Sequence, residues 1–134
     1  MNPVVHFEMP YEDAERVSKF YQQAFGWNAS KMGPEMGGYI TVETTKTDPQ
    51  TARPSEPGAI NGGFFPKSDR NPVPGVVIAV DDIKVAMQKV KDAGGKILGS
   101  SQGMDEPDDI PGVGFYMSIE DPEGNRVALL QPKM

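Results

Sequence analysis

The sequence predicts an α+β protein made of two tandem βαβββ modules, with helices on one face of a mostly antiparallel sheet. The first observation is a short apolar run at residues 4–9 that is followed by apolar residues at helical spacing. The second is the return of the same plan 69 residues later, from residue 76 onward. The third is that strand-like segments and turn residues follow each predicted helix.

The first module opens with a strand and a helix. Residues 4–9 (VVHFEM) are rich in β-forming residues and end at Pro10. Asp13 stands near the start of the predicted helix and Gly26 just past its end. The residues of the apolar stripe between them recur at helical spacing: Ala14, Val17, Tyr21, Ala24 and Phe25.

The second module repeats this plan without a gap. Residues 76–80 form a buried strand in this interpretation, and Asp81 and Asp82 are candidate helix caps. The next apolar stripe ends at Gly94-Gly95 and contains Ile83, Ala86, Met87, Val90 and Ala93. In one register Asp13 corresponds to Asp82 and Gly26 to Gly95, which indicates a duplicated module.

Further strands are expected after each helix. In module one they are residues 38–44 and 59–65, and in module two they are 96–98, 115–119 and 126–131. The sequence DPEGN at 121–125 predicts the turn of the last hairpin. Residues 45–58, 66–74 and 101–112 are predicted loops.

Length and composition limit the function classes. The 134 residues predict one domain, 1–134, with module one at about 1–66 and module two at about 74–134. The 15 glycines and 13 prolines indicate many turns, and the absence of cysteine excludes disulfides and thiolate metal sites. A net charge of −6 disfavours nucleic-acid and membrane partners. No apolar stretch is long enough to span a membrane, and we expect a cytoplasmic protein.

Four stretches together resemble the vicinal oxygen chelate superfamily, which contains glyoxalase I, bleomycin resistance proteins and extradiol dioxygenases. They are HFE at 6–8 followed by Asp13, FY at 20–21 leading to FGW at 25–27, VDDI at 80–83, and DPEGN at 121–125. The closest likeness is to the poorly characterised glyoxalase-like branch. The resemblance implies two modules that form a cupped sheet with the helices on its outer face. It also implies a homodimer.

The resemblance further implies where metal ligands would stand. The first position falls on His6, its counterpart in module two on Gly75, and the closing glutamate position on Ala128. The remaining position should lie in 59–65, where Asn61 is the only polar side chain. A divalent metal needs three or four donors, so we expect no metal and no other cofactor.

Strand alternation selects candidate ligand-binding residues independently of the family. Val5, Phe7 and Met9 share one face of the first strand and should pack under the helix, which leaves His6 and Glu8 on the other face. Histidine can exchange a proton near neutral pH, so His6 is the best catalytic candidate, with Glu8 beside it. The alternative is that both side chains only hydrogen-bond to neighbouring strands.

The same alternation adds Thr41 from module one, on the face of Tyr39 and Glu43, and Tyr116 from module two. Arg126 either binds an anionic ligand group or stands exposed at its strand end. The predicted cavity is polar on the side of module one and mostly apolar on the side of module two, which suits a small organic ligand.

Two function classes follow. The first is a glyoxalase- or bleomycin-resistance-like protein that binds a small organic ligand without the family metal. The second is a lyase, isomerase or dioxygenase-type enzyme that uses His6, with Glu8, as base or metal ligand. A structural role in dimerisation is a third interpretation.

Overall fold

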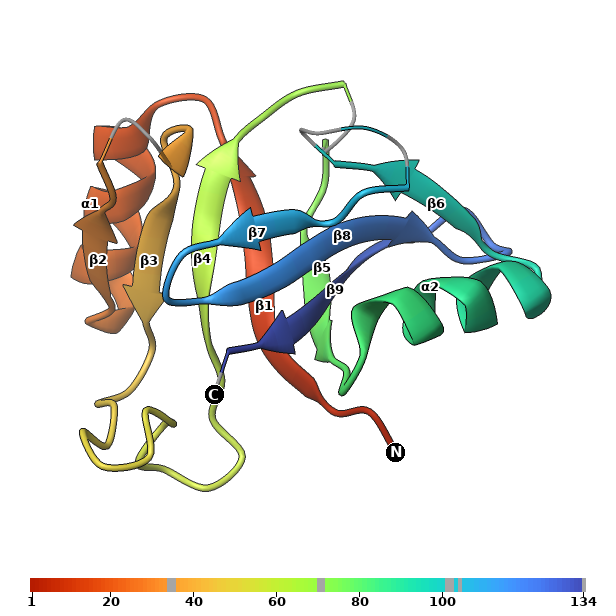
Figure 1. The fold of residues 1–134 in the computed structure, drawn as a ribbon. Coiled ribbons are helices and arrows are strands. Elements are labelled where there is room, and N and C mark those ends of the chain that lie inside the picture. Colours follow the sequence, from red (N-terminus) through yellow and green to blue (C-terminus); the bar gives the residue numbers. More distant parts are fainter. Residues whose placement is uncertain (34–35, 70–71, 101–102, 104, 134) are drawn as a thin grey trace. The chain divides into compact units, whose positions relative to one another are not determined.

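The computed structural model describes residues 1–33, 36–69, 72–100, 103 and 105–133 (Figure 1). Its contacts divide the chain into two compact units. We call residues 6–74 the N-terminal unit, and residues 75–134 together with 1–5 the C-terminal unit. Neither helix of the described residues is long and apolar enough to cross a membrane.

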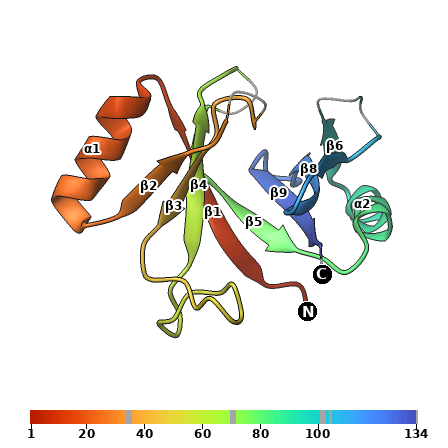
Figure 2. The same cartoon turned by 60° about the vertical axis from the view of Figure 1, so that its left-hand side comes forward.

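The N-terminal unit is a four-stranded sheet with one helix. In chain order its elements are β1 (Val4–Tyr11, whose first two residues belong to the other unit), α1 (Ala14–Phe25), β2 (Asn28–Lys31), β3 (Ile40–Glu43) and β4 (Asn61–Pro66). The strand order is β2-β3-β4-β1, with β1 parallel to β4 and the other two pairs antiparallel. Figure 2 shows α1 beside these strands.

Helix α1 begins and ends where its sequence signals stand. The Asp13 side chain accepts a hydrogen bond from the backbone N–H of Arg16, and Gly26 closes the helix at φ 75°, which favours glycine. The inner side of α1 packs on a core of Ile40, Val42 and Phe64. Tyr21 stacks on Trp27 at 4.8 Å between ring centroids and extends this core to the end of the helix.

The C-terminal unit repeats the plan with one additional strand. Its elements are β5 (Gly75–Ala79), α2 (Ile83–Asp92), β6 (Lys96–Gly99), β7 (Asp108–Ile110), β8 (Gly114–Glu120) and β9 (Arg126–Pro132). The strand order is β5-β9-β8-β6, and β7 pairs with β8. The pair β5·β9 is parallel, and those of β8 with β6, β7 and β9 are antiparallel.

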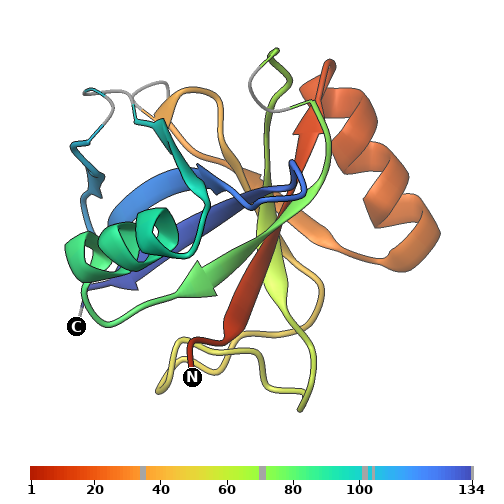
Figure 3. The same ribbon diagram turned by 90° about the vertical axis from the view of Figure 1, so that its right-hand side faces the viewer.

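Helix α2 covers one face of these strands (Figure 3). The Asp82 carboxylate accepts hydrogen bonds from the backbone N–H groups of Lys84 and Val85 and starts the helix. The core under α2 is apolar throughout, and its buried members are Val80, Ile83, Met87, Ile97, Met117, Ile119 and Leu129. The predicted α+β class with two βαβββ modules is therefore confirmed, with the helix of each module packed on one face of its own sheet.

Two strands were not predicted. The four residues of β2 are all exposed, so they lack the apolar alternation that would mark a strand. Strand β7 lies inside the predicted loop 101–112 and begins with Asp108 and Asp109, which are poor β-formers. Both segments are strands because a neighbouring strand supplies their hydrogen bonds, which no local pattern reveals.

The DPEGN turn between β8 and β9 predicts a pH-dependent stability. The Asp121 carboxylate accepts hydrogen bonds from the side chain and backbone of Asn125 and from the backbone of Glu123, and these bonds hold its pKa below the usual value. A depressed folded-state pKa stabilises the protein above the unfolded-state pKa, and this gain is lost as pH falls through the folded-state pKa. We expect Asp121→Asn to lower Tm at neutral pH, with the difference narrowing in acid.

Thermal unfolding between pH 2 and pH 7 measures this effect. Glu123→Gln is the matched control, because Glu123 contributes only its backbone N–H to the turn bonds. A Tm difference between Asp121→Asn and wild type that stays constant with pH would contradict the assignment.

Candidate functional site

The sheet of the N-terminal unit has a polar face on the side away from α1, which we call the N-terminal helix-free face. His6 pairs with Asn61 across the parallel β1·β4 ladder, and Glu8 pairs with Gly63. Thr41 of β3 pairs with Gly63 from the other side. Directly paired residues share a face, so these residues and Glu43, two positions after Thr41, lie together. The alternating residues Phe7 and Met9 pack with α1 instead, as predicted.

The imidazole of His6 has a fixed orientation. Its Nδ1 lies 3.1 Å from the backbone carbonyl oxygen of Asn61. A carbonyl oxygen can only accept, so Nδ1 carries the proton and donates this bond. In the neutral ring Nε2 is then the unprotonated nitrogen, which can accept a proton or bind an electrophile. The geometry therefore gives His6 one basic atom.

Glu8 is the most buried charged side chain on this face. It is 4% exposed, and it is the one charged residue in the buried class among the described parts of the chain. Burying a carboxylate is costly unless polar or charged groups compensate it, so such residues are seldom retained for packing alone. Glu8 is two residues after His6 on β1, so their backbone positions are about 6.5–7 Å apart.

Tyr39 is a site residue that the candidate set omitted. A Cβ atom on Gly63 would collide with the phenol oxygen and ring of Tyr39, so the tyrosine ring covers Gly63 on the N-terminal helix-free face. Strand alternation in the sequence already predicts that Tyr39, Thr41 and Glu43 share one face. The glycine that makes room for the ring is identified only by the β3·β4 register.

Asn61 has a structural role. Its side-chain oxygen accepts hydrogen bonds from the backbone N–H groups of Thr44 and Thr45 at 2.8 and 3.3 Å. Its amide nitrogen donates to the hydroxyl of Thr47, which itself donates to Glu43 at 2.6 Å. These bonds fasten the chain after β3 to the start of β4. They also hold the peptide whose carbonyl orients His6.

Thr41 is exposed in β3, between β2 and β4. Its hydroxyl donates to the backbone carbonyl of Ser30 in β2 at 3.3 Å. Thr41 therefore shares the face of His6 and Glu8, as predicted, and already uses its hydroxyl proton within the sheet.

The C-terminal unit has an apolar wall on the side away from α2, with the cation of Arg126 beside it. Val77, Ala128 and Leu130 form a buried cluster against which Tyr116 packs. The Arg126 guanidinium donates to the hydroxyl of Tyr116 at 2.8 Å and to that of Ser118 at 2.9 Å. The structure thus brings the two predicted residues Tyr116 and Arg126 together. The alternative that Arg126 stands exposed at its strand end is wrong, because its side chain folds back along β8 and is half-buried.

The register also locates the fourth family ligand position. Ala128 pairs with Val77, which is two residues after Gly75. The equivalent relation in the first module is the pair of Gly63 with Glu8, which is two residues after His6. The fourth position is therefore Gly63, and Asn61, the polar side chain of that strand, is two residues away.

These positions do not fit a divalent metal. Gly63 and Gly75 have no side chain, the tyrosine ring covers Gly63, and Ala128 is fully buried. Ser118, the strand neighbour of Ala128, is bonded to a guanidinium, so a cation stands near the place where the family carboxylate would. His6 is the single donor of the four, whereas Zn²⁺ and similar ions need three or four. Among the described residues, no group of three or more His, Cys, Asp and Glu could hold a metal.

The fold and these faces define a class of paired-module α+β protein with a polar patch around one histidine. Comparison with known families agrees. The family described as Glyoxalase/Bleomycin resistance protein/Dioxygenase superfamily matches residues 4–129. The chain belongs to this superfamily.

Similar proteins agree with this assignment. A glyoxylase-like domain-containing protein of Didymella fabae is 32% identical over 126 residues, which cover 91% of this chain and 88% of that protein. A hypothetical protein from Bacillus halodurans C-125 has the same fold, with a TM-score of 0.67 at 16% identity over 99% of this chain and 96% of the other. A methylmalonyl-CoA epimerase from Streptomyces coelicolor gives a TM-score of 0.68 at 15% identity, covering 98% and 95% of the two chains.

Proposed function

We propose that this protein binds a small organic ligand on the helix-free face of its N-terminal unit and does so without the divalent metal of its superfamily. One observation carries the proposal: of the family ligand positions His6, Gly63, Gly75 and Ala128, only His6 has a donor atom. A shared fold does not carry the metal chemistry of a superfamily with it, because function depends on the side chains of the site.

The chemistry of this face supports an organic ligand. The N-terminal helix-free face offers the imidazole of His6, the carboxylate of Glu8 and the ring of Tyr39. Within the C-terminal unit, the apolar cluster around Ala128 and the hydroxyl of Tyr116 form a separate surface on which a ligand could also bind. Few polar groups beside apolar and aromatic surface are typical of sites for small molecules, in which the polar groups fix the orientation of the ligand.

Thermal-shift screening in the presence and absence of EDTA tests the proposal. We expect a ligand that raises Tm equally in both conditions, since no metal takes part; saturation at a hundred times Kd stabilises by about 2.7 kcal/mol. His6→Ala and Glu8→Gln should each reduce the shift, while Gln23→Ala on the exposed side of α1 should leave it unchanged. A shift that EDTA abolishes would contradict a metal-independent site.

A second candidate function is proton transfer by His6. It is favoured by the bond between His6 Nδ1 and the Asn61 carbonyl, which leaves Nε2 as a base. Solved structures of similar fold include methylmalonyl-CoA epimerases, whose name denotes isomerisation. We propose testing α-proton exchange of acyl-CoA thioesters in D₂O, together with turnover of hemithioacetals, epoxides and catechols. Activity that survives in the His6→Ala, Glu8→Ala double variant would exclude this mechanism.

Homodimerisation remains a proposal that rests on the family likeness. Light scattering at micromolar concentration should give twice the mass of one chain. A mass near that of a single chain would refute it.

A further inference from the structure

The N-terminal unit has a recess that neither His6 nor Glu8 lines. It has a volume of about 350 Å³ and is formed where β1 ends, α1 begins and the chain leaves β4. We call it the Arg16 pocket, and its lining residues are Pro10, Tyr11, Glu12, Asp13, Arg16, Val17, Phe20 and Lys67. The residues assigned above to ligand binding on the N-terminal helix-free face, His6, Glu8 and Tyr39, do not line it.

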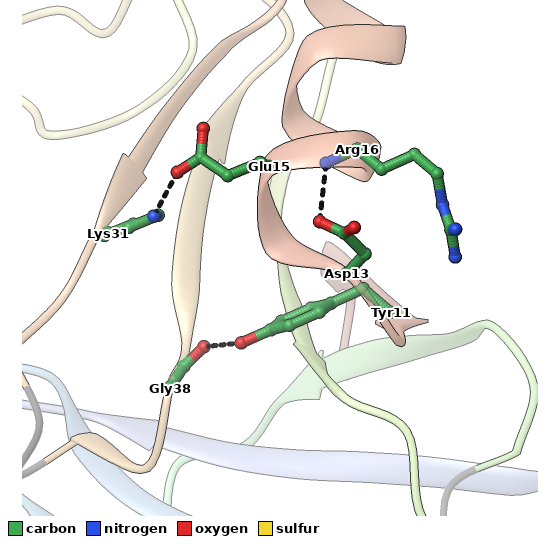
Figure 4. A network of polar contacts seen from close by, with 6 residues as sticks. All are labelled: Tyr11, Asp13, Glu15, Arg16, Lys31 and Gly38. Atoms are coloured by element: carbon green, nitrogen blue, oxygen red, sulfur yellow. Dashed lines mark hydrogen bonds and ion pairs between the residues drawn. The ribbon is translucent and has the colours of Figure 1, made fainter.

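The carboxylates of this pocket are engaged in internal contacts. Asp13 caps α1 by accepting from the backbone N–H of Arg16 at 3.0 Å. Glu12 pairs with Lys67 at 3.4 Å. Nearby, Glu15 pairs with Lys31 at 2.5 Å (Figure 4). The pocket has two cations, Lys67 and Arg16. These contacts bond a carboxylate of the pocket to Lys67 but none to the guanidinium of Arg16.

Among the described residues, the guanidinium of Arg16 has no hydrogen-bond or ion-pair partner. Figure 4 shows its side chain extending away from Asp13 and Glu15, while its backbone N–H alone is bonded. A guanidinium presents a planar fork of donors that matches a carboxylate in two parallel hydrogen bonds. The pocket therefore offers a cation suited to an anionic group of a ligand.

The remaining wall of the pocket is apolar. Pro10 and Val17 line it, and Phe20 contributes a ring that is 56% exposed although phenylalanine is normally buried. Phe20 is held edge-on against Tyr21 at 4.9 Å between ring centroids, so its outer side is presented in a fixed position. A ligand ring can pack against Phe20 in the offset or edge-to-face arrangement that aromatic pairs favour.

We infer that the Arg16 pocket binds a small aromatic carboxylate, with the carboxylate on the Arg16 guanidinium and the ring against Phe20 and Val17. The volume accommodates a ring with a short substituent, and the positive charge of Arg16, whose guanidinium has no partner within the described parts of the chain, selects an anion over a neutral analogue. This site goes beyond the proposed function, because neither His6 nor Glu8, on which the proposed ligand binding rests, lines the pocket.

Titration of the ¹⁵N-labelled protein with benzoate, followed by NMR, tests the inference. We expect shifts of the backbone amides of residues 13–17 and of Lys67, and Arg16→Gln should weaken binding about tenfold. Phe20→Ala should weaken it as well. Lys19→Gln is the matched control: it also removes one positive charge from α1, but Lys19 does not line the pocket. Benzyl alcohol and acetate should each bind more weakly than benzoate.

Three results would overturn the inference: no saturable shifts with benzoate, equal affinity for benzyl alcohol, or an unchanged Kd in Arg16→Gln. His6→Ala should not alter benzoate binding at this pocket. A failure here therefore leaves the proposed function standing, and a failure of ligand binding at His6 leaves this pocket standing.

Discussion

Phe64→Ala should lower the free energy of unfolding by about 3–5 kcal/mol, the usual cost of removing a buried phenylalanine ring. Phe64 is 0% exposed and lies between the buried residues Ile40 and Val42 and the aromatic side of α1, where it contacts Tyr21 at 5.5 Å between ring centroids. The loss combines the transfer free energy of the ring with the cavity that the rigid strands leave behind.

Urea unfolding followed by circular dichroism measures this loss. Phe25→Ala is the matched control, because it deletes the same side chain from a position that is 63% exposed, and we expect it to cost less than about 1 kcal/mol. Equal losses in the two variants would show that the ring of Phe64 is not the centre of this core.

Gly62→Ala should destabilise the protein by about 2–3 kcal/mol, within the range of overpacking. An added Cβ would collide with the backbone carbonyl oxygen of Phe7 and would approach the Phe7 ring to 2.7 Å. The carbonyl belongs to the parallel β1·β4 pair, so it can move only if that pair opens.

Gly63→Ala is the informative comparison for Gly62→Ala. The three atoms nearest to its added Cβ all belong to the end of the Tyr39 side chain and not to the backbone, so we expect a smaller loss than in Gly62→Ala and a changed Tyr39 NMR signal. Chemical denaturation of both variants provides the numbers. A larger loss in Gly63→Ala than in Gly62→Ala would contradict the close approach of Phe7 to Gly62.

Much of the fold was predictable because its signals are local. The cap residues Asp13 and Asp82 and the stripes at helical spacing lie within single segments, and the structure confirms both helices. Strands β2 and β7 were not predictable, because β2 is exposed throughout and β7 begins with two aspartates, and both segments form strands only through pairing with β3 and β8. Pairing depends on residues distant in the chain, which a local pattern does not contain.

The candidate site was predictable only in part for the same reason. Alternation along single strands placed His6 and Glu8 on the face away from the helix. The cover of Gly63 by Tyr39 and the bond that orients His6 depend on how β1, β3 and β4 are registered. The position of Arg126 depends on the β8·β9 register, which brings the hydroxyls of Tyr116 and Ser118 within its reach.

The metal content of the purified protein tests the central claim most directly. We predict that elemental analysis after purification without added metal or chelator finds no divalent ion in stoichiometric amount, and that calorimetric titration with Zn²⁺, Ni²⁺ or Mn²⁺ shows no tight site. One tightly bound divalent ion per chain that is lost in His6→Ala would contradict the account.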